Sequence, residues 1–191
     1  MPETLEHRHE VARITCMVHQ RLDERVTECL RSLGAHTVLQ ENARCVRQRV
    51  RSRAWGLPGL RVDLDNAPME IFRTTVPRPA AARVLGALAD AVDLRTPGRG
   101  AVYAQDLVEL SPQEPPSIEP DSGMPGDLLR DFTLITAILS LPGRGQELAG
   151  IALKLGVAVP VVSLGEGTGL RDRMGLLRVT IPPEKELVHL M

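Results

Sequence analysis

The feature that most constrains the fold is a residue pattern that occurs twice in this 191-residue sequence. Apolar residues at helical spacing, closed by a glycine, match between the two halves at one constant offset. The matched residues are Val26, Cys29, Leu30, Leu33 and Gly34 in the first half, and Leu148, Ile151, Ala152, Leu155 and Gly156 in the second. The spacing i, i+3, i+4, i+7 predicts a helix, and the glycine is expected just beyond its C-terminus.

A second match follows at another constant offset, in segments typical of β-strands. Met69–Pro77 aligns with Met174–Pro182, and Met, Arg, Thr and Pro are identical. The change of offset falls in the connection after the second expected strand, which is longer in the first copy. Two tandem copies of one structural unit explain both matches.

The first copy predicts the order β-α-β-β-α-β. Strands are expected at 12–18, from 37–40, at 68–76 and at 101–110, with helices at 23–33 and 79–91. This is the ferredoxin-like split βαβ pattern, an antiparallel sheet with two helices on one face. The expected fold class is therefore α+β, built from tandem ferredoxin-like βαββαβ modules.

The second copy predicts strands at 133–139, 159–163 and 175–181, a helix at 146–155 and the start of a helix at Glu184–Met191. It lacks the last helix and strand. In the 4-1-3-2 strand order of this fold, losing strand four leaves the edge of Thr133–Leu139 unpaired. We expect either a partner strand at that edge or a native chain that continues beyond Met191.

The expected domain organisation has four parts. A tail at 1–11 precedes a first domain at 12–110, and an incomplete second domain occupies 128–191. Between them, residues 111–127 hold five prolines, four acidic residues and no basic residue, which is the composition of a linker.

Composition excludes several functions. Only 2% of residues are aromatic and the net charge is −1, which argues against nucleic-acid binding. The apolar runs are too short for direct membrane insertion. Three widely spaced cysteines without a CxxC motif, and a charged N-terminus, favour a reducing cytoplasm. No nucleophile–base pair is present, so we do not expect an enzyme.

Five arginines without an intervening acid lie in the long connection after the second expected strand, followed by a tryptophan. They are Arg44, Arg47, Arg49, Arg51 and Arg53, and then Trp55. From Arg47 they alternate, so on an extended chain they line one side. Two interpretations stand: a docking surface for an acidic or phosphorylated partner, and a solvated loop or edge strand.

Glycines at alternate positions follow the strand expected at 159–163. Gly165, Gly167 and Gly169 permit close backbone approach, so their N–H groups can face an anion. A plain connection between two strands explains them equally well. At Leu141–Gly145, similarly, either an anion site or a simple turn precedes the expected helix.

Three places in the chain resemble the P-II nitrogen regulatory family, including its divergent P-II-like members. Val159–Gly169 resembles the second strand and the Gly-x-Gly base of the family's T-loop. Glu70–Pro77 and Leu176–Pro182 resemble the third strand, and Thr96–Tyr103 resembles the B-loop and final strand. The likeness covers most of residues 12–110 and 132–191.

The resemblance implies a non-catalytic signalling protein that requires no cofactor. Family members bind ATP or ADP, sometimes with 2-oxoglutarate, between subunits of a trimer, and the T-loop docks on a transporter or enzyme. We therefore expect a small anionic effector, an adenine nucleotide above others, and an unidentified regulated protein. A homo-oligomer is expected, with a trimer favoured over a dimer of two fused modules.

The two copies depart from the family in complementary ways. The first has Ala43-Arg-Cys45 where the second has Gly165-Glu-Gly167, and only the first retains the B-loop-like Pro97–Gly100. We therefore expect one composite nucleotide site that draws on both copies. Its residues are Gly165, Gly167, Thr168 and Gly169 from the second copy, and Gly98, Arg99 and Gly100 from the first.

Two alternative functions remain open. One is a nucleotide-independent interaction module of the same fold that uses the arginine segment. The other is a metal-binding trimer like the divalent-cation tolerance proteins, with His7 and His9 beside Cys16 or His19 as ligands. Because a histidine pair in a tail is usually incidental, we assign no metal site.

Overall fold

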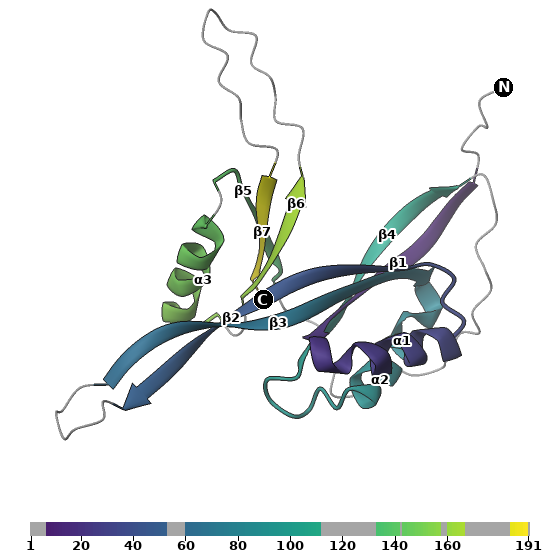
Figure 1. Cartoon of the computed structure of the whole chain (residues 1–191). Coiled ribbons are helices and arrows are strands. Elements are labelled where there is room, and N and C mark those ends of the chain that lie inside the picture. The colour runs from purple at the N-terminus through teal and green to yellow at the C-terminus, as the bar shows by residue number, and fades with distance from the viewer. Residues whose placement is uncertain are drawn as a thin grey trace, which may run out of the picture. The chain divides into compact units, whose positions relative to one another are not determined.

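The computed structural model describes residues 7–52, 60–111, 133–141, 143–157, 160–166 and 184–190. The chain divides into two compact units (Figure 1). The first unit comprises Met1–Glu41 and Glu70–Arg130, and the second comprises Asn42–Met69 and Asp131–Met191. Two long strands, β2 (Val38–Ser52) and β3 (Leu60–Pro77), contribute residues to both units.

The first unit has the predicted β-α-β-β-α-β order. Besides its parts of β2 and β3, it contains β1 (His7–His19), α1 (Asp23–Ser32), α2 (Ala81–Ala91) and β4 (Gly100–Ser111), with short 3-10 helices at Gln20–Leu22 and Arg78–Ala80. Its strands lie in the order β4-β1-β3-β2. This is the 4-1-3-2 order of the ferredoxin-like fold.

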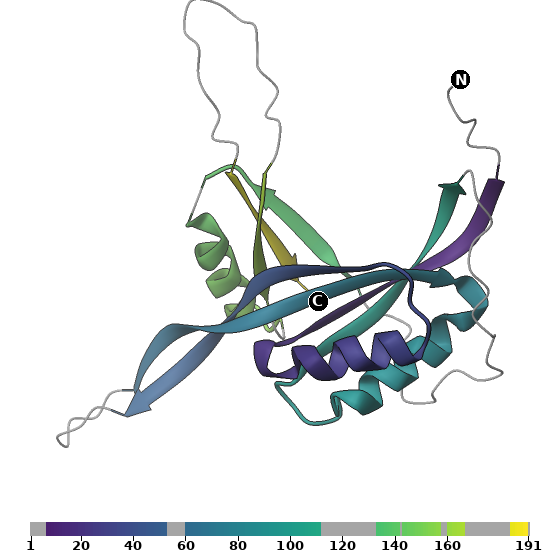
Figure 2. The same cartoon turned by 45° about the vertical axis from the view of Figure 1, so that its right-hand side comes forward.

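Two periodicities produce the core of the first unit. Every second residue of β1 from Ala12 to Val18 belongs to this core, together with apolar residues of α1 and α2. Both helices lie on one face of the sheet (Figure 2). The buried set is Ala12, Ile14, Cys16, Val18, Val26, Leu30, Phe72, Val76, Val84, Leu85, Leu88 and Val92. The core is aliphatic except for Cys16 and Phe72, and the low aromatic content fits this composition.

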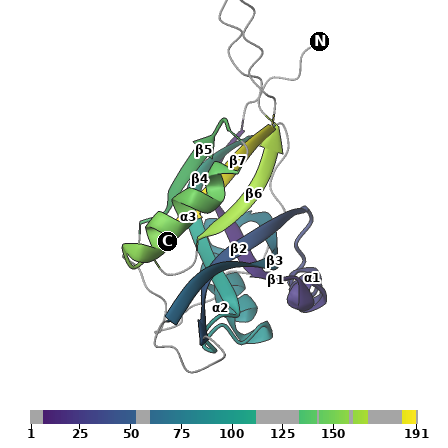
Figure 3. The same ribbon diagram turned by 60° about the vertical axis from the view of Figure 1, so that its left-hand side comes forward.

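The second unit contains β5 (Ile135–Leu139), α3 (Arg144–Lys154), β6 (Val161–Glu166) and β7 (Glu184–Leu190). Its strands follow the order β2-β6-β7-β5, and the β2–β6, β6–β7 and β5–β7 pairs are antiparallel (Figure 3). Helix α3 packs on this sheet through Ala149 and Ala152, which contact a cluster that includes Val162 and Val188.

The repeated glycines end their helices in the same way. After α1, Gly34 has φ +76°, and the N–H of Ala35 donates to the carbonyl of Leu30 at 3.0 Å. After α3, Gly156 has φ +89°, and the N–H of Val157 donates to the carbonyl of Ala152 at 3.0 Å. Both are Schellman motifs, in which a left-handed residue lets the backbone satisfy the last carbonyls.

The predicted apolar stripe of α3 is only partly buried. Ile151 and Leu155 are 55% and 79% exposed, whereas their counterparts Cys29 and Leu33 pack against the first unit's core. In the first unit α2 completes that core, and among the described residues of the second unit no second helix does so.

The predicted helix start at Glu184–Met191 is wrong, because residues 184–190 form strand β7. The segment is rich in helix-forming residues, but β7 is paired with β5 on one side and β6 on the other. Tertiary pairing overrides local propensity here. The strand expected at 175–181 lies outside the described residues, and β7 occupies the third-strand position of the second unit.

The long connection predicted after the second strand is also wrong. β2 extends to Ser52 and β3 begins at Leu60, so Arg44, Arg47, Arg49 and Arg51 lie on β2, and Asp65 lies on the neighbouring strand β3. Polar residues suit such a ribbon because its faces can remain in water. The second compact unit therefore includes residues 42–69, which the sequence prediction gave to the first domain.

Burial predicts a clear order of cysteine reactivity. Desolvation raises the pKa of Cys16 to about 12 and also raises the pKa of the half-exposed Cys29 and the buried Cys45. The thiolate is the reactive form, so a raised pKa lowers reactivity at pH 8. We expect iodoacetamide to modify native Cys29 first, and Cys16 and Cys45 only after denaturation, as measured by peptide mass spectrometry. Equal rates at Cys16 and Cys29 would contradict the assigned core.

Candidate functional site

The turn that resembles a B-loop lies between α2 and β4 in the first unit. Gly98 has φ +84° and Gly100 has φ +144°, values that L-residues rarely adopt. A Cβ on Gly100 would lie 2.0 Å from the carbonyl oxygen of Met17 in β1, whereas one on Gly98 would meet no atom within 4 Å. Gly100 is therefore required by close backbone contact, and Gly98 only by its conformation.

Arg99 is folded back onto the C-terminus of α2. Its Nε lies 3.7 Å from Asp93 Oδ2, and its Nη1 donates to the carbonyl of Val92 at 3.5 Å. The hydroxyl of Thr96 donates to the same Asp93 oxygen at 2.6 Å. The Arg99 side chain remains 36% exposed. An anion approaching this guanidinium must therefore compete with the Asp93 carboxylate.

The other half of the expected site lies in the second unit. Gly165 belongs to strand β6, where it pairs with Lys185, instead of to the loop that follows. A Cβ there would come within 2.8 Å of Leu187 Cδ1. Gly167, Thr168 and Gly169 lie outside the described residues. The composite site thus remains a prediction.

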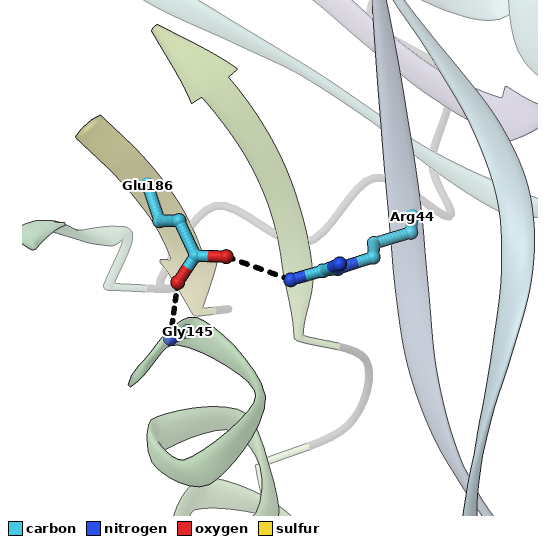
Figure 4. Close-up of polar contacts among 3 residues, drawn as sticks. All are labelled: Arg44, Gly145 and Glu186. Carbon is cyan, nitrogen blue, oxygen red and sulfur yellow. Dashed lines mark hydrogen bonds and ion pairs between the residues drawn. The ribbon is translucent and has the colours of Figure 1, made fainter. Parts of the chain in front are cut away.

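The second unit also contains a buried carboxylate that the sequence prediction missed. Glu186 of β7 is 4% exposed and uses both of its oxygens (Figure 4). Oε1 accepts from Arg44 Nη2 of β2 at 2.8 Å, and Oε2 accepts from the backbone N–H of Gly145 at 2.7 Å. Gly145 lies in the first turn of α3, where helical N–H groups have no intrahelical partner and favour a negative charge.

This contact explains the turn at Leu141–Gly145. The anion at the N-terminus of α3 is the chain's own Glu186. Gly145 admits no side chain without movement, because a Cβ would lie 2.9 Å from Val162 Cγ1 and 3.0 Å from Glu186 Oε2. An external anion would have to displace a charge-paired carboxylate, so the geometry favours a structural role.

A sequence signal for Glu186 does exist. Glu186, Val188 and Leu190 alternate, and β7 places all three on one face. Val188 and Leu190 belong to the core that α3 covers. Because the segment was predicted to be helical, its residues were not assigned to alternate faces, and Glu186 was not recognised as buried.

The arginines of the predicted docking segment have different environments. Arg44 is ion-paired with Glu186, and its side chain is 36% exposed. Arg47 and Arg49 are exposed on β2, with Arg49 Nη1 at 3.9 Å from Asp65 Oδ2. Arg51 lies on β2, whereas Arg53 and Trp55 lie outside the described residues. Docking through this segment stays a prediction.

The histidines proposed as metal ligands cannot share an ion with Cys16. All lie on the extended strand β1, so His9 and Cys16 are separated by roughly 23 Å at about 3.3 Å per residue. His19 Nδ1 accepts from the N–H of Arg21 at 3.2 Å. Within the described ranges, no group of three or more His, Cys, Asp or Glu side chains is placed to hold a metal ion.

Within the part of the chain that the structure describes, every helix is too short or too polar to cross a bilayer.

Comparisons with known proteins identify structural neighbours but no sequence family. No protein-family model and no curated protein matches the chain. Among solved structures, the GlnK–ATP complex of B. subtilis aligns with 51% of this chain and 84% of its own, at 11% identity and a TM-score of 0.40. CPII from Thiomonas intermedia K12, bound to ADP and bicarbonate, aligns with 56% of this chain and 94% of its own, at 16% identity and a TM-score of 0.35.

The two glycines of the turn make a matched pair for mutagenesis. Gly98→Ala should cost about 1–2 kcal/mol from the left-handed backbone alone. Gly100→Ala should cost about 3 kcal/mol or more, because it adds a clash with a backbone oxygen to that strain. Urea unfolding measures both values. Equal destabilisation would contradict the close packing of Gly100 against β1.

Removing the Glu186 carboxylate should destabilise the second unit. Glu186→Ala leaves the Arg44 guanidinium and the N–H of Gly145 without their acceptor. We expect the free energy of unfolding to fall by about 2–4 kcal/mol. Glu186→Gln keeps a neutral acceptor and should cost less, about 1–2 kcal/mol.

Arg95→Ala is the control, because the Arg95–Asp90 pair is 61% and 68% exposed and should contribute under about 1 kcal/mol. Unfolding followed by hydrogen exchange localises each effect. An effect of Glu186→Ala no larger than that of the control would contradict the anchoring role of Glu186.

Proposed function

We propose that this protein is a non-catalytic, P-II-like regulator that senses a small anionic effector and acts on a partner protein through its loops. The effector we favour is an adenine nucleotide, ATP or ADP. The partner is a transporter or an enzyme, the location is the cytoplasm, and the assembly is a homo-oligomer with a trimer favoured. The chain is proposed to be a tandem of two modules, the second incomplete.

The observation that carries the proposal is the glycine turn on a ferredoxin-like unit. The first unit has the 4-1-3-2 strand order, and Gly100 fixes the turn against β1. Arg99 belongs to this turn, and its side chain is 36% exposed. Arginine and glycine N–H groups together can hold phosphate without any catalytic group.

Arg99 supplies a mechanism for binding. Its guanidinium lies 3.7 Å from Asp93 Oδ2, in a loose and partly exposed ion pair. Such a pair contributes little to stability. A phosphate with more negative charge can replace Asp93 at small cost, and the glycines at 165–169 are proposed to complete the site from the second module.

Isothermal titration with ATP, ADP and AMP tests the proposal. We expect heat with at least one nucleotide, and at least a tenfold weaker affinity for Arg99→Ala, since a charge-assisted contact contributes roughly 1.5–3 kcal/mol. Arg95→Ala is the matched control, because Arg95 lies near Arg99 in sequence and pairs with Asp90 at 2.7 Å. No heat with any nucleotide would contradict the proposal.

A second candidate is a nucleotide-independent interaction module. The specific observation in its favour is that Arg47 and Arg49 are exposed at alternate positions of β2. Absence of nucleotide binding in the titration, with partner binding lost on Arg47→Glu and Arg49→Glu, would favour it over the nucleotide sensor.

A further inference from the structure

The outer strand of the second unit has one edge that no described strand covers. β5 pairs with β7 from Ile135 opposite Leu190 to Leu139 opposite Glu186. It is the terminal strand of its sheet, so no described strand pairs with its other edge (Figure 3). The backbone groups that point away from β7 therefore form a template for another strand.

The composition of β5 lacks the usual protection of an edge. Its sequence is Ile-Thr-Ala-Ile-Leu, with no charge and no proline. Ile135 and Ile138 are 55% and 68% exposed. The outer strand of the first unit differs, since β4 carries Asp106 and Glu109, and Asp106 is ion-paired with Arg78 at 3.0 Å. Charges on an edge strand discourage pairing with another chain.

We propose that β5 pairs antiparallel with β5 of a second copy of this chain, about a two-fold axis through Ala137. This register places Ile135 opposite Leu139 of the second copy, and Thr136 opposite its Ile138. The face that carries Ala137 and Leu139 toward the core of the second unit is then the same in both copies. An aliphatic ladder continues across the contact.

The lack of charge favours a second copy over a different partner. A two-fold contact brings every group near its own equivalent, so a charged edge repels itself. β5 has no charged side chain, so two copies do not repel each other. In the proposed register each side chain of β5 lies opposite an aliphatic side chain or a threonine. The contact lies entirely within the second unit and does not depend on nucleotide binding.

Residue 138 offers the sharpest test of this pairing. About the proposed axis the two copies of residue 138 are diagonal neighbours, roughly 7–8 Å apart across the pair. Ile138→Lys and Ile138→Glu should each raise the dissociation constant of the full-length protein at least tenfold. Equimolar mixing of the two variants should restore association, because unlike charges then meet.

Leu164→Lys is the control, since Leu164 is 72% exposed on the inner strand β6 of the same sheet. Sedimentation equilibrium over a range of protein concentrations should give a limiting mass for wild type and Leu164→Lys that is twice that of Ile138→Lys. Circular dichroism checks that each variant is folded. If a charge at 138 prevents folding, Ile138→Thr keeps a β-branched residue and should still weaken association severalfold.

Three results would overturn the proposal. One is a wild-type mass that does not change with concentration and equals that of folded Ile138→Lys. Another is loss of association in both variants without recovery on mixing, which would indicate a different partner or register. The third is equal weakening by Leu164→Lys. Since nucleotide is absent throughout, failure here is distinguishable from failure of the proposed effector site.

Discussion

The second unit depends on the contacts of a single carboxylate. Glu186 is 142 residues from Arg44 and 41 residues from Gly145, yet one oxygen binds each of them. It thereby joins β7 to β2 and fixes the start of α3 over the sheet. The absence of a side chain at Gly145 is part of the same arrangement, because any Cβ there would contact the carboxylate. A helix N-terminus that could have bound a free anion is instead satisfied from within the chain.

The element order of the first unit could be predicted from sequence, although β1 begins at His7, inside the predicted tail at 1–11. Its signals are local and agree with one another: apolar spacing at Val26 and Leu30, glycine at Gly34, and alternation along β1. The second unit was harder because its signals conflict. Glu184–Leu190 has helical propensity but forms a strand between two others. Its strand state depends on partners far away in sequence, which local patterns do not contain.

The functional residues were also hard to predict, because their contacts involve partners far away in sequence. Glycines and arginines mark places where backbone conformation or charge matters, and the turn at Gly98–Gly100 is such a place. Sequence does not show which charges are already used. Arg44 belonged to the predicted docking segment, but its guanidinium is ion-paired with the buried Glu186 carboxylate at 2.8 Å. Arg99 forms only a longer ion pair, at 3.7 Å, with Asp93. This difference in pairing leaves Arg99 as the better candidate for binding an external phosphate.

We propose that Gly98–Gly100 and the glycines at 165–169 contribute to one nucleotide site. Hydrogen exchange of the full-length protein with and without ATP tests it most directly, because bound phosphate slows exchange of the amides that contact it. We expect slower exchange in peptides that contain Gly98–Gly100 and, at the same ATP concentrations, in peptides that contain Gly165–Gly169. Slower exchange in only one of these segments, or in neither, would contradict it.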